Sequence, residues 1–346
     1  QEPCGAGKKS RLGAPRTVRR SLPRTLGEKV VKRAVRMVQY VGKQAGRQRM
    51  ELDPLAIRNL LIWIALALGN IIFLGATPNW MRCGAKRADP SAASALFALV
   101  FAGASAAFLA FTGGAGALLT LSVQQYLILA ACGLLSALTW LSLFTAMTGG
   151  RVNKVIPVYL LGSIFTLTAS HFIFGAPLGL WKICCVIVIL LGIVFIESGS
   201  KNLGGQLWFI YALISALASA GTALLRRGFL GDAFNETLFQ TARSAAACVF
   251  LWIFVFLRGK QNTLGDLSPR GWVGVSFAAL SYAASFVCTY YASLRGDISE
   301  LAPIGILAFA FVMLFSRMFQ KEKQPGSSVF GTVLVLLGQF GILMGL

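Results

Sequence analysis

Few side chains in this sequence are of a type that does chemistry, and most of them stand alone. The 346 residues include one His and 12 Asp or Glu, and no Asp or Glu falls in the middle of an apolar stretch. Catalysis inside a membrane protein needs a nucleophile with a base, or a set of metal ligands. The seven cysteines are scattered and lack a C-x-x-C spacing. The sequence therefore argues against an enzyme, a metal site, a bound cofactor and a disulfide framework.

Arg243 is the charged side chain that lies deepest in an apolar stretch. A guanidinium group donates two parallel hydrogen bonds to a carboxylate or a phosphate, so Arg243 is a candidate for binding an anionic group. The alternative is a structural arginine that reaches the nearby membrane interface or bonds to the carbonyls of a neighbouring helix. His171 and Arg317 lie near the ends of two other stretches. They are candidates for gating residues or, alternatively, for interfacial anchors.

Aromatic side chains offer a better candidate pocket. Tyr282, Phe286 and Tyr290 follow one another at intervals of four, which places them on one face of a helix. A ligand cavity combines apolar walls with a few polar groups, and Tyr, Trp and Asn supply both. The alternative for each residue is helix packing or contact with lipid. The complete set of candidate cavity residues is Trp63, Asn70, Trp140, Phe209, Arg243, Tyr282, Phe286 and Tyr290.

The elements that position these residues are apolar helices in a membrane. The chain is 56% hydrophobic and 13% charged, with a mean hydropathy of +0.70, whereas soluble domains are roughly 25% charged. A membrane-crossing helix needs about 20 mostly apolar residues. Ten stretches approach this length, so we expect an all-α integral membrane protein with ten transmembrane helices. They are 57–76, 91–111, 123–147, 152–174, 178–197, 203–225, 236–257, 270–294, 299–318 and 326–346.

The sequence repeats itself after 146 residues without a gap. Residues 57–200 form the first copy and residues 201–346 the second, with five predicted helices each. Because five is odd, the second copy must cross the membrane in the opposite sense, which predicts a 5+5 inverted-topology repeat. Substrates of such folds bind between the two copies. The matching positions are Gly75 and Gly221, Gly150 and Gly296, Pro157 and Pro303, and Gly192 and Gly338.

These motifs resemble those of the EamA-type permeases of the drug/metabolite transporter superfamily. The first copy reads Ala146-x3-Gly150-x6-Pro157 before a helix with Gly192, and the second reads Ala292-x3-Gly296-x6-Pro303 before a helix with Gly338. The resemblance implies a multi-pass transporter of the plasma or inner membrane that exports or imports small organic metabolites by alternating access. Pro157 and Pro303 are the predicted hinges. In place of the second copy's Glu322, the first copy has Ala176.

Several functions remain in competition at this point. Amino acids or related compounds are the first guess for the substrate, from the breadth of the family and the aromatic pocket. A neutral, zwitterionic or anionic molecule suits a cavity whose one deep charge is positive. Export of lipophilic cations is disfavoured, since the spans contain no carboxylate. The alternatives are a nucleotide-sugar or phosphate-ester antiporter of the same fold, and a non-transporting scaffold or lipid scramblase. A monomer suffices, because the two copies already complete the pseudo-symmetric pair, and a homodimer is compatible with the sequence.

The N-terminal tail, residues 1–56, is strongly basic. Residues 1–58 contain 15 of the 32 Lys and Arg but only 4 of the 12 acids. The first 25 residues have a composition that cannot form a core, and from Leu26 onward the spacing of the apolar residues predicts an amphipathic helix on the membrane surface. No nucleic-acid recognition motif accompanies the charge, so nucleic acid is not an expected partner. The chain starts at Gln1 and Met50 precedes the apolar part, so the alternative to a membrane-surface role is that residues 1–49 are a non-native extension or a dispensable tail.

The orientation in the membrane stays open. The resemblance implies that both termini are cytoplasmic, but loop charges then contradict the positive-inside rule, which places Lys and Arg in cytoplasmic loops. The outside loops would contain Arg82, Lys86, Arg87, Arg151, Lys154, Lys201, Arg258, Lys260, Arg270, Arg317, Lys321 and Lys323. The inside loops would contain Lys182, Arg226, Arg227 and Arg295.

Overall fold

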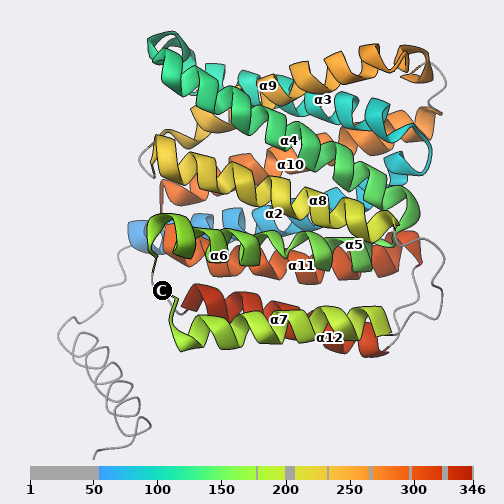
Figure 1. The fold of residues 1–346 in the computed structure, drawn as a ribbon. Helices are drawn as coiled ribbons and strands as arrows, with labels where there is room; N and C mark the ends of the chain where they lie inside the picture. Colours follow the sequence, from blue (N-terminus) through green and yellow to red (C-terminus); the bar gives the residue numbers. More distant parts are fainter. Residues whose placement is uncertain are drawn as a thin grey trace, which may run out of the picture. The chain divides into compact units, whose positions relative to one another are not determined.

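The apolar stretches form helices throughout the part of the chain that the structure describes. The structure is a computed structural model, and it describes residues 54–176, 178–198, 207–231, 234–264, 268–295, 298–321 and 326–344. Within these ranges the chain contains helices and no strand (Figure 1). Residues 1–53 lie outside the described residues. They include the predicted surface helix and all but the last three residues of the predicted basic tail.

The helices follow one another with short connections. In chain order they are α2 (Pro54–Ala85), α3 (Pro90–Phe111), η1 (Gly114–Thr120), α4 (Val123–Gly149), α5 (Val152–Tyr159), α6 (Gly162–Phe174), α7 (Leu180–Ser198), α8 (Leu207–Leu225), η2 (Arg226–Leu230), α9 (Glu236–Leu257), η3 (Gln261–Leu264), α10 (Pro269–Ser293), α11 (Ile298–Gln320) and α12 (Gly326–Met344). The short segments η1 and η3 are 3₁₀ helices, and η2 is a π-helical turn that continues α8.

Eight helical segments within the described ranges are long and apolar enough to cross a membrane. Two further apolar stretches, Leu180–Ile196 in α7 and Leu307–Gln320 in α11, are shorter. A helix suits a bilayer because it satisfies its own backbone hydrogen bonds where no water is present. The chain is therefore an integral, multi-pass membrane protein, and each of the ten predicted stretches overlaps one of these helices.

The first helix is longer than its hydropathy indicates. The predicted span ends at residue 76, but α2 continues to Ala85 because its polar residues find partners on neighbouring segments. Asn79 Nδ2 donates to the carbonyl oxygen of Val312 on α11 at 3.2 Å. Arg82 Nη1 donates to the carbonyl oxygen of Gly150 at 2.6 Å. Arg82, which the sequence analysis assigned to a loop, is therefore a buried helical residue.

The predicted fourth span, residues 152–174, is two helices rather than one. α5 and α6 are separated at Leu160 and Leu161, three residues after Pro157. Leu161 and Ser163 bond to carbonyls three residues earlier, those of Val158 and Leu160, so the chain forms a tighter turn there. In the second copy α11 is continuous through Pro303, whose side chain lies outside the described part. The two copies therefore differ at the predicted hinge.

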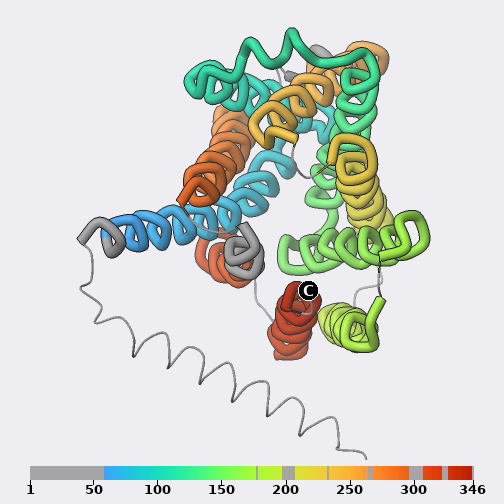
Figure 2. Tube along the Cα trace, turned by 90° about the vertical axis from the view of Figure 1, so that its left-hand side faces the viewer, coloured from blue at the N-terminus to red at the C-terminus, as the bar shows by residue number. Residues whose placement is uncertain are grey.

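Most helix contacts repeat with the same 146-residue offset as the sequence. α8 packs against α4, α5 and α6. α2, the equivalent of α8, packs against α10 and α11, where Gly75 lies against Phe311 and Gly84 against Val275. α3 pairs with its equivalent α9, and α7 with its equivalent α12. Figures 1 and 2 show α7 and α12 side by side. The two copies are thus packed in the same way.

Asp89 is the N-cap residue of α3 and also connects two loops. Its carboxylate accepts a hydrogen bond from the backbone N–H of Ser91 at 3.0 Å, and Lys260 Nζ lies 3.6 Å from its other oxygen. Burial favours the neutral form of Asp89, but the hydrogen bonds from Ser91 and the charge of Lys260 outweigh it and lower the pKa of this carboxyl. The ionised carboxylate therefore caps the helix and links the α2–α3 connection to the one after α9.

Glycines allow α7 and α12 to approach closely. A Cβ atom on Gly192 would lie 2.6 Å from the carbonyl oxygen of Gly331, and one on Gly338 would lie 2.8 Å from that of Cys185. The two contacts are equivalent under the repeat, since Cys185 and Gly331 also differ by 146. Small residues at helix interfaces let backbones pack together where the hydrophobic effect is absent.

We expect Gly192→Ala to lower the thermal unfolding temperature in detergent by a few degrees, because overpacking at a tight contact costs about 1–3 kcal/mol. The matched control is Gly103→Ala, since a Cβ atom on Gly103 of α3 would meet no atom within 4 Å. Both variants would be measured by the temperature at which half of the protein is lost from its gel-filtration peak. Equal unfolding temperatures for the two variants would contradict the close contact.

Candidate functional site

A cavity of about 380 Å³ lies between the two copies of the repeat. Helices α2, α3, α4 and α5 of the first copy line it, together with α10, α11 and α12 of the second. Its volume falls in the range of about 300–1,000 Å³ that is usual for small-molecule sites, and none of its lining residues is charged. These residues are Leu74, Thr77, Pro78, Met81, Phe97, Thr139, Trp140, Leu143, Ile156, Tyr159, Leu160, Tyr282, Ala308, Phe309, Val312, Leu336 and Gln339.

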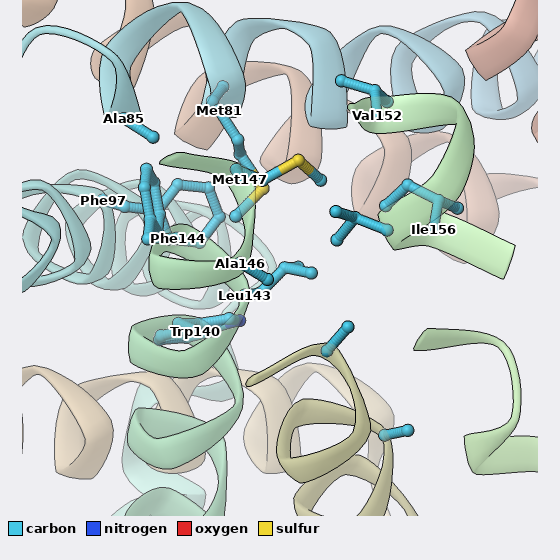
Figure 3. Packing of buried hydrophobic residues seen from close by; sticks show 14 of the residues in the cluster. Met81, Ala85, Phe97, Trp140, Leu143, Phe144, Ala146, Met147, Val152 and Ile156 are labelled. Carbon is cyan, nitrogen blue, oxygen red and sulfur yellow. The ribbon is translucent and has the colours of Figure 1, made fainter. Parts of the chain in front are cut away.

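Three aromatic rings form one corner of the cavity. The ring centroid of Phe97 lies 5.3 Å from that of Trp140, edge to face, and 6.1 Å from that of Tyr282. Figure 3 shows Phe97 meeting Phe144, which lies one turn from Trp140 on α4. Edge-to-face pairs fix the orientation of their rings because the positive ring edge meets the negative ring face. The corner is therefore a rigid wall made by α3, α4 and α10.

Most polar groups of the lining already have partners within the protein. Thr77 and Thr139 donate their hydroxyl hydrogens to carbonyls of their own helices, and the hydroxyl of Tyr159 lies 3.4 Å from that of Ser219. The Tyr282 hydroxyl and the Trp140 indole N–H, by contrast, have no hydrogen-bond partner among the described residues. These two groups are accordingly the best placed in the aromatic corner to bind a ligand.

The break between α5 and α6 lies at the cavity and is joined to α12. Gln339 Nε2 donates to the carbonyl oxygen of Leu160 at 3.2 Å and to the hydroxyl of Ser163 at 2.7 Å. The N–H and the hydroxyl of Ser163 also donate to the Leu160 carbonyl, which suits a bilayer, where a carbonyl without a partner is costly. Gln339 adds a donor at the break and connects the two copies. Its equivalent in the first copy is Ile193, which cannot make these bonds.

Arg243 lies outside the cavity lining and packs against the aromatic corner. Its Cζ atom is 5.8 Å from the ring centroid of Trp140, and its Nη1 donates to Ser136 Oγ at 2.9 Å. Arg243 is itself buried. A cation over the face of an indole ring is attracted by the ring's negative quadrupole. The one deep charge predicted from the sequence is thus separated from the cavity by one side chain.

Three other predicted residues, Trp63, Asn70 and Phe209, are not part of the lining. Asn70 is buried between α2 and α10, where its Oδ1 accepts a hydrogen bond from Ser285 Oγ at 2.6 Å. The indole nitrogen of Trp63 is buried without a hydrogen-bond partner. Phe209 is half-buried and packs edge to face against Trp208, with ring centroids 5.9 Å apart. Asn70 thus joins two helices, and Phe209 packs against the buried core.

The aromatic stripe on α10 reaches the cavity with its first member only. Tyr282 lines the cavity, whereas Phe286 and Tyr290 lie against Phe108 of α3, with ring centroid distances of 5.8 Å and 5.2 Å. The stripe runs along the helix axis, but the cavity occupies one level of the bundle. Phe286 and Tyr290 therefore belong to the contact between α3 and α10.

The predicted gating residues lie on the surface of the bundle. His171 and Arg317 are both exposed, and His171 Nδ1 lies 2.7 Å from the carbonyl oxygen of Ala176 at the end of α6. His171 therefore closes the last turn of its own helix. Within the described ranges, no group of three His, Cys, Asp or Glu is arranged to hold a metal ion.

The sequence analysis missed four residues that shape the cavities. Phe97 stands at the repeat position of Arg243, so a comparison of the two copies would have found it. Tyr159 and Gln339 are isolated polar residues in apolar helices, which is a weak signal. Arg82 was hidden because the predicted span ended too early. It lines a second cavity of about 320 Å³ with Ala76, Asn79, Trp80, Cys83, Lys86, Arg87, Phe315, Phe319 and Gln320.

Comparisons with known proteins agree with the internal repeat. The model of the EamA-like transporter family matches this chain twice, at residues 61–198 and 206–344. A solved crystal structure is similar over 82% of this chain and 97% of its own chain, with a TM-score of 0.52 and 15% sequence identity. At this identity the similarity shows the fold alone. A search of curated proteins gives no match.

We expect Asn70 and Ser285 to be energetically coupled, because their hydrogen bond joins α2 to α10. In a double-mutant cycle of Asn70→Ala and Ser285→Ala, the stability losses should be non-additive by about 0.5–1.5 kcal/mol. Chemical unfolding in mixed micelles measures each variant. Asn70→Ala combined with Ser293→Ala is the control, since Ser293 bonds within its own helix. Additive losses for Asn70 and Ser285 would disprove the coupling.

Proposed function

Since this chain belongs to the EamA-like transporter family, within the drug/metabolite transporter superfamily, we propose that it is a secondary transporter of small organic metabolites. The family match confirms the resemblance inferred from the sequence. One observation above all supports the proposal: the cavity is lined by helices of both copies of the repeat. A site at such an interface opens to one side or the other when the copies move against each other.

The proposed membrane topology is ten helices in a 5+5 inverted repeat. The helix contacts that recur at the 146-residue offset support this arrangement, as does the separate family match to each half. Of the two shorter apolar stretches, in α7 and α11, the one in α7 packs along α12, and Figure 2 shows this pair at the edge of the bundle. In the proposed mechanism, the alternating movement takes place between the other helices, and the break between α5 and α6 is the place where one copy bends.

The proposed substrate is neutral or zwitterionic, with amino acids and related compounds as the first candidates. The cavity is lined by aromatic and aliphatic side chains without a charge. The Tyr282 hydroxyl and the Trp140 indole N–H offer hydrogen bonds to a polar group of the substrate. The described lining contains no carboxylate that could form an ion pair with a lipophilic cation.

The phosphate-ester and nucleotide-sugar alternative has less support. A phosphate group is usually held by several Lys or Arg side chains or by a helix N-terminus. The described lining has neither Lys nor Arg, and Arg243 lies beside it rather than in it. A scaffold, a scramblase or an enzyme has no specific observation in its favour.

The test is flux in proteoliposomes. Vesicles that contain the purified full chain would be loaded with labelled amino acids and sampled with and without a pH gradient. Release faster than from empty liposomes supports a metabolite transporter, and a dependence on the gradient would show coupling to protons. If folded protein releases no member of the panel but exchanges phosphate esters, the substrate proposal is wrong. If it instead moves labelled phospholipid between leaflets, the chain is a scramblase.

We expect Trp140→Ala to reduce this flux at least about tenfold, because it removes the central ring of the cavity's aromatic corner. Trp272→Ala is the matched control, since Trp272 on α10 is exposed and lies outside the described lining. Gel filtration would show whether each variant is folded. Trp140→Phe, which keeps a ring but removes the indole N–H, should lie between the two. Equal flux of the Trp140→Ala and Trp272→Ala variants would contradict the proposed site.

A further inference from the structure

Arg243 is a buried cation whose hydrogen-bond partners are neutral. The residue is 9% exposed. Its Nη1 donates to Ser136 Oγ and its Nη2 to Gln240 Oε1, while its buried Nε has no partner. Arginine does not lose its proton in proteins. A full positive charge therefore lies inside the bundle without contact to a carboxylate among the described residues.

The carboxylate of Glu236, on the same helix, is engaged elsewhere. Glu236 forms an ion pair with Arg226 and accepts a hydrogen bond from Gln240 Nε2 at 3.0 Å. Gln240 in turn accepts the hydrogen bond of Arg243. The amide of Gln240 thus stands between the carboxylate and the guanidinium, and Arg226 compensates the negative charge. The charge of Arg243 is held in place but is not neutralised.

The repeat shows that this charge breaks the symmetry of the cavity. Arg243 of the second copy is equivalent to Phe97 of the first, and Ser136 is equivalent to Tyr282. The hydrogen bond between Arg243 and Ser136 therefore corresponds to the ring contact between Phe97 and Tyr282, whose centroids are 6.1 Å apart. One of these two equivalent places has an aromatic pair that lines the cavity, and the other has a cation.

Both equivalent residues contact Trp140. Phe97 meets its ring edge to face at 5.3 Å, and the Arg243 guanidinium carbon lies 5.8 Å from the ring centroid. Because Trp140 lines the cavity, the charge of Arg243 is separated from the cavity by the Trp140 side chain. In a surrounding of low polarity the field of a charge extends over such a distance with little screening. The described lining has no acidic side chain that opposes it.

We propose that Arg243 is a specificity-determining residue that makes the cavity electropositive through Trp140, so that it admits neutral, zwitterionic and anionic molecules and excludes cations. This inference rests on the proposed function and adds to it a reason why cations are excluded. Arg243 acts on the substrate through the electrostatic potential of the cavity and does not touch it.

The experiment measures the electrostatic potential of the cavity with charged thiol reagents. Leu143, which lines the cavity one turn from Trp140, is replaced by cysteine in a background whose seven native cysteines are replaced by serine or alanine. Leu143→Cys is then modified with the anionic reagent sulfonatoethyl methanethiosulfonate or with the cationic reagent trimethylammonioethyl methanethiosulfonate. The ratio of the two rates reports the potential, because any change in thiol ionisation affects both reagents equally.

With Arg243 present, the anionic-to-cationic rate ratio should exceed that of free cysteine in solution by at least about tenfold. Arg243→Gln should bring the ratio close to the solution value, and Arg243→Lys should restore it. Arg258→Gln is the matched control, since Arg258 caps the same helix, lies over the ring of Phe254 at 4.7 Å and is exposed. This control should leave the ratio unchanged.

A ratio equal to that of free cysteine in the presence of Arg243 would overturn the inference, even if Arg243→Gln fails to fold. A ratio that Arg243→Gln leaves high would also overturn it. The reagents need no transported substrate, so these outcomes are distinct from an absence of amino-acid flux, which would reject the proposed function. If neither reagent modifies Leu143→Cys, the cavity is closed to ions and the inference fails.

Discussion

The absence of water in the bilayer governs where these helices are regular and where they deviate. A helix satisfies its own backbone there, and any carbonyl freed by a break needs a partner from the protein. At the break between α5 and α6, the carbonyl of Leu160 accepts hydrogen bonds from Ser163 and from Gln339 of α12. The same constraint explains why Arg82 can lie within α2, since it donates to the carbonyl of Gly150 at the end of α4. Gln339 and Arg82 are thus polar side chains that bond to backbone groups of neighbouring segments.

The two copies of the repeat pack alike but differ at the cavity. Gly192 and Gly338 make equivalent contacts in the α7–α12 pair, so the packing between these helices follows the repeat. Gln339 and Arg243, in contrast, correspond to Ile193 and Phe97. Packing constrains both copies to the same backbone, whereas a cavity between them needs different side chains to bind an asymmetric molecule. Functional residues in such a fold are therefore found where the repeat positions differ in chemistry.

The sequence predicted the fold better than the site, for physical reasons. Hydropathy and the 146-residue offset depend on composition over many residues, so they located the helices and the two halves. Tyr282 was selected because aromatic spacing marks a helix face, and Trp140 because it stands at the repeat position of Phe286. The same spacing also selected Phe286 and Tyr290, since periodicity gives the face of a helix but not the depth at which a cavity lies. Arg82 was missed because hydropathy falls at a charged residue whether or not the helix ends there.

The cavity itself indicates how it would discriminate between substrates. The hydroxyls of Thr77 and Thr139 and the amide of Gln339 are engaged within the protein, so few hydrogen bonds are available to a ligand. Affinity must then come largely from apolar contact, which is weakly selective, and discrimination from the shape of the cavity and the sign of its potential. Loose binding of this kind suits transport, because a substrate that binds tightly is released slowly. A fixed charge behind an aromatic wall adds selectivity without adding a strong bond that would have to be broken at release.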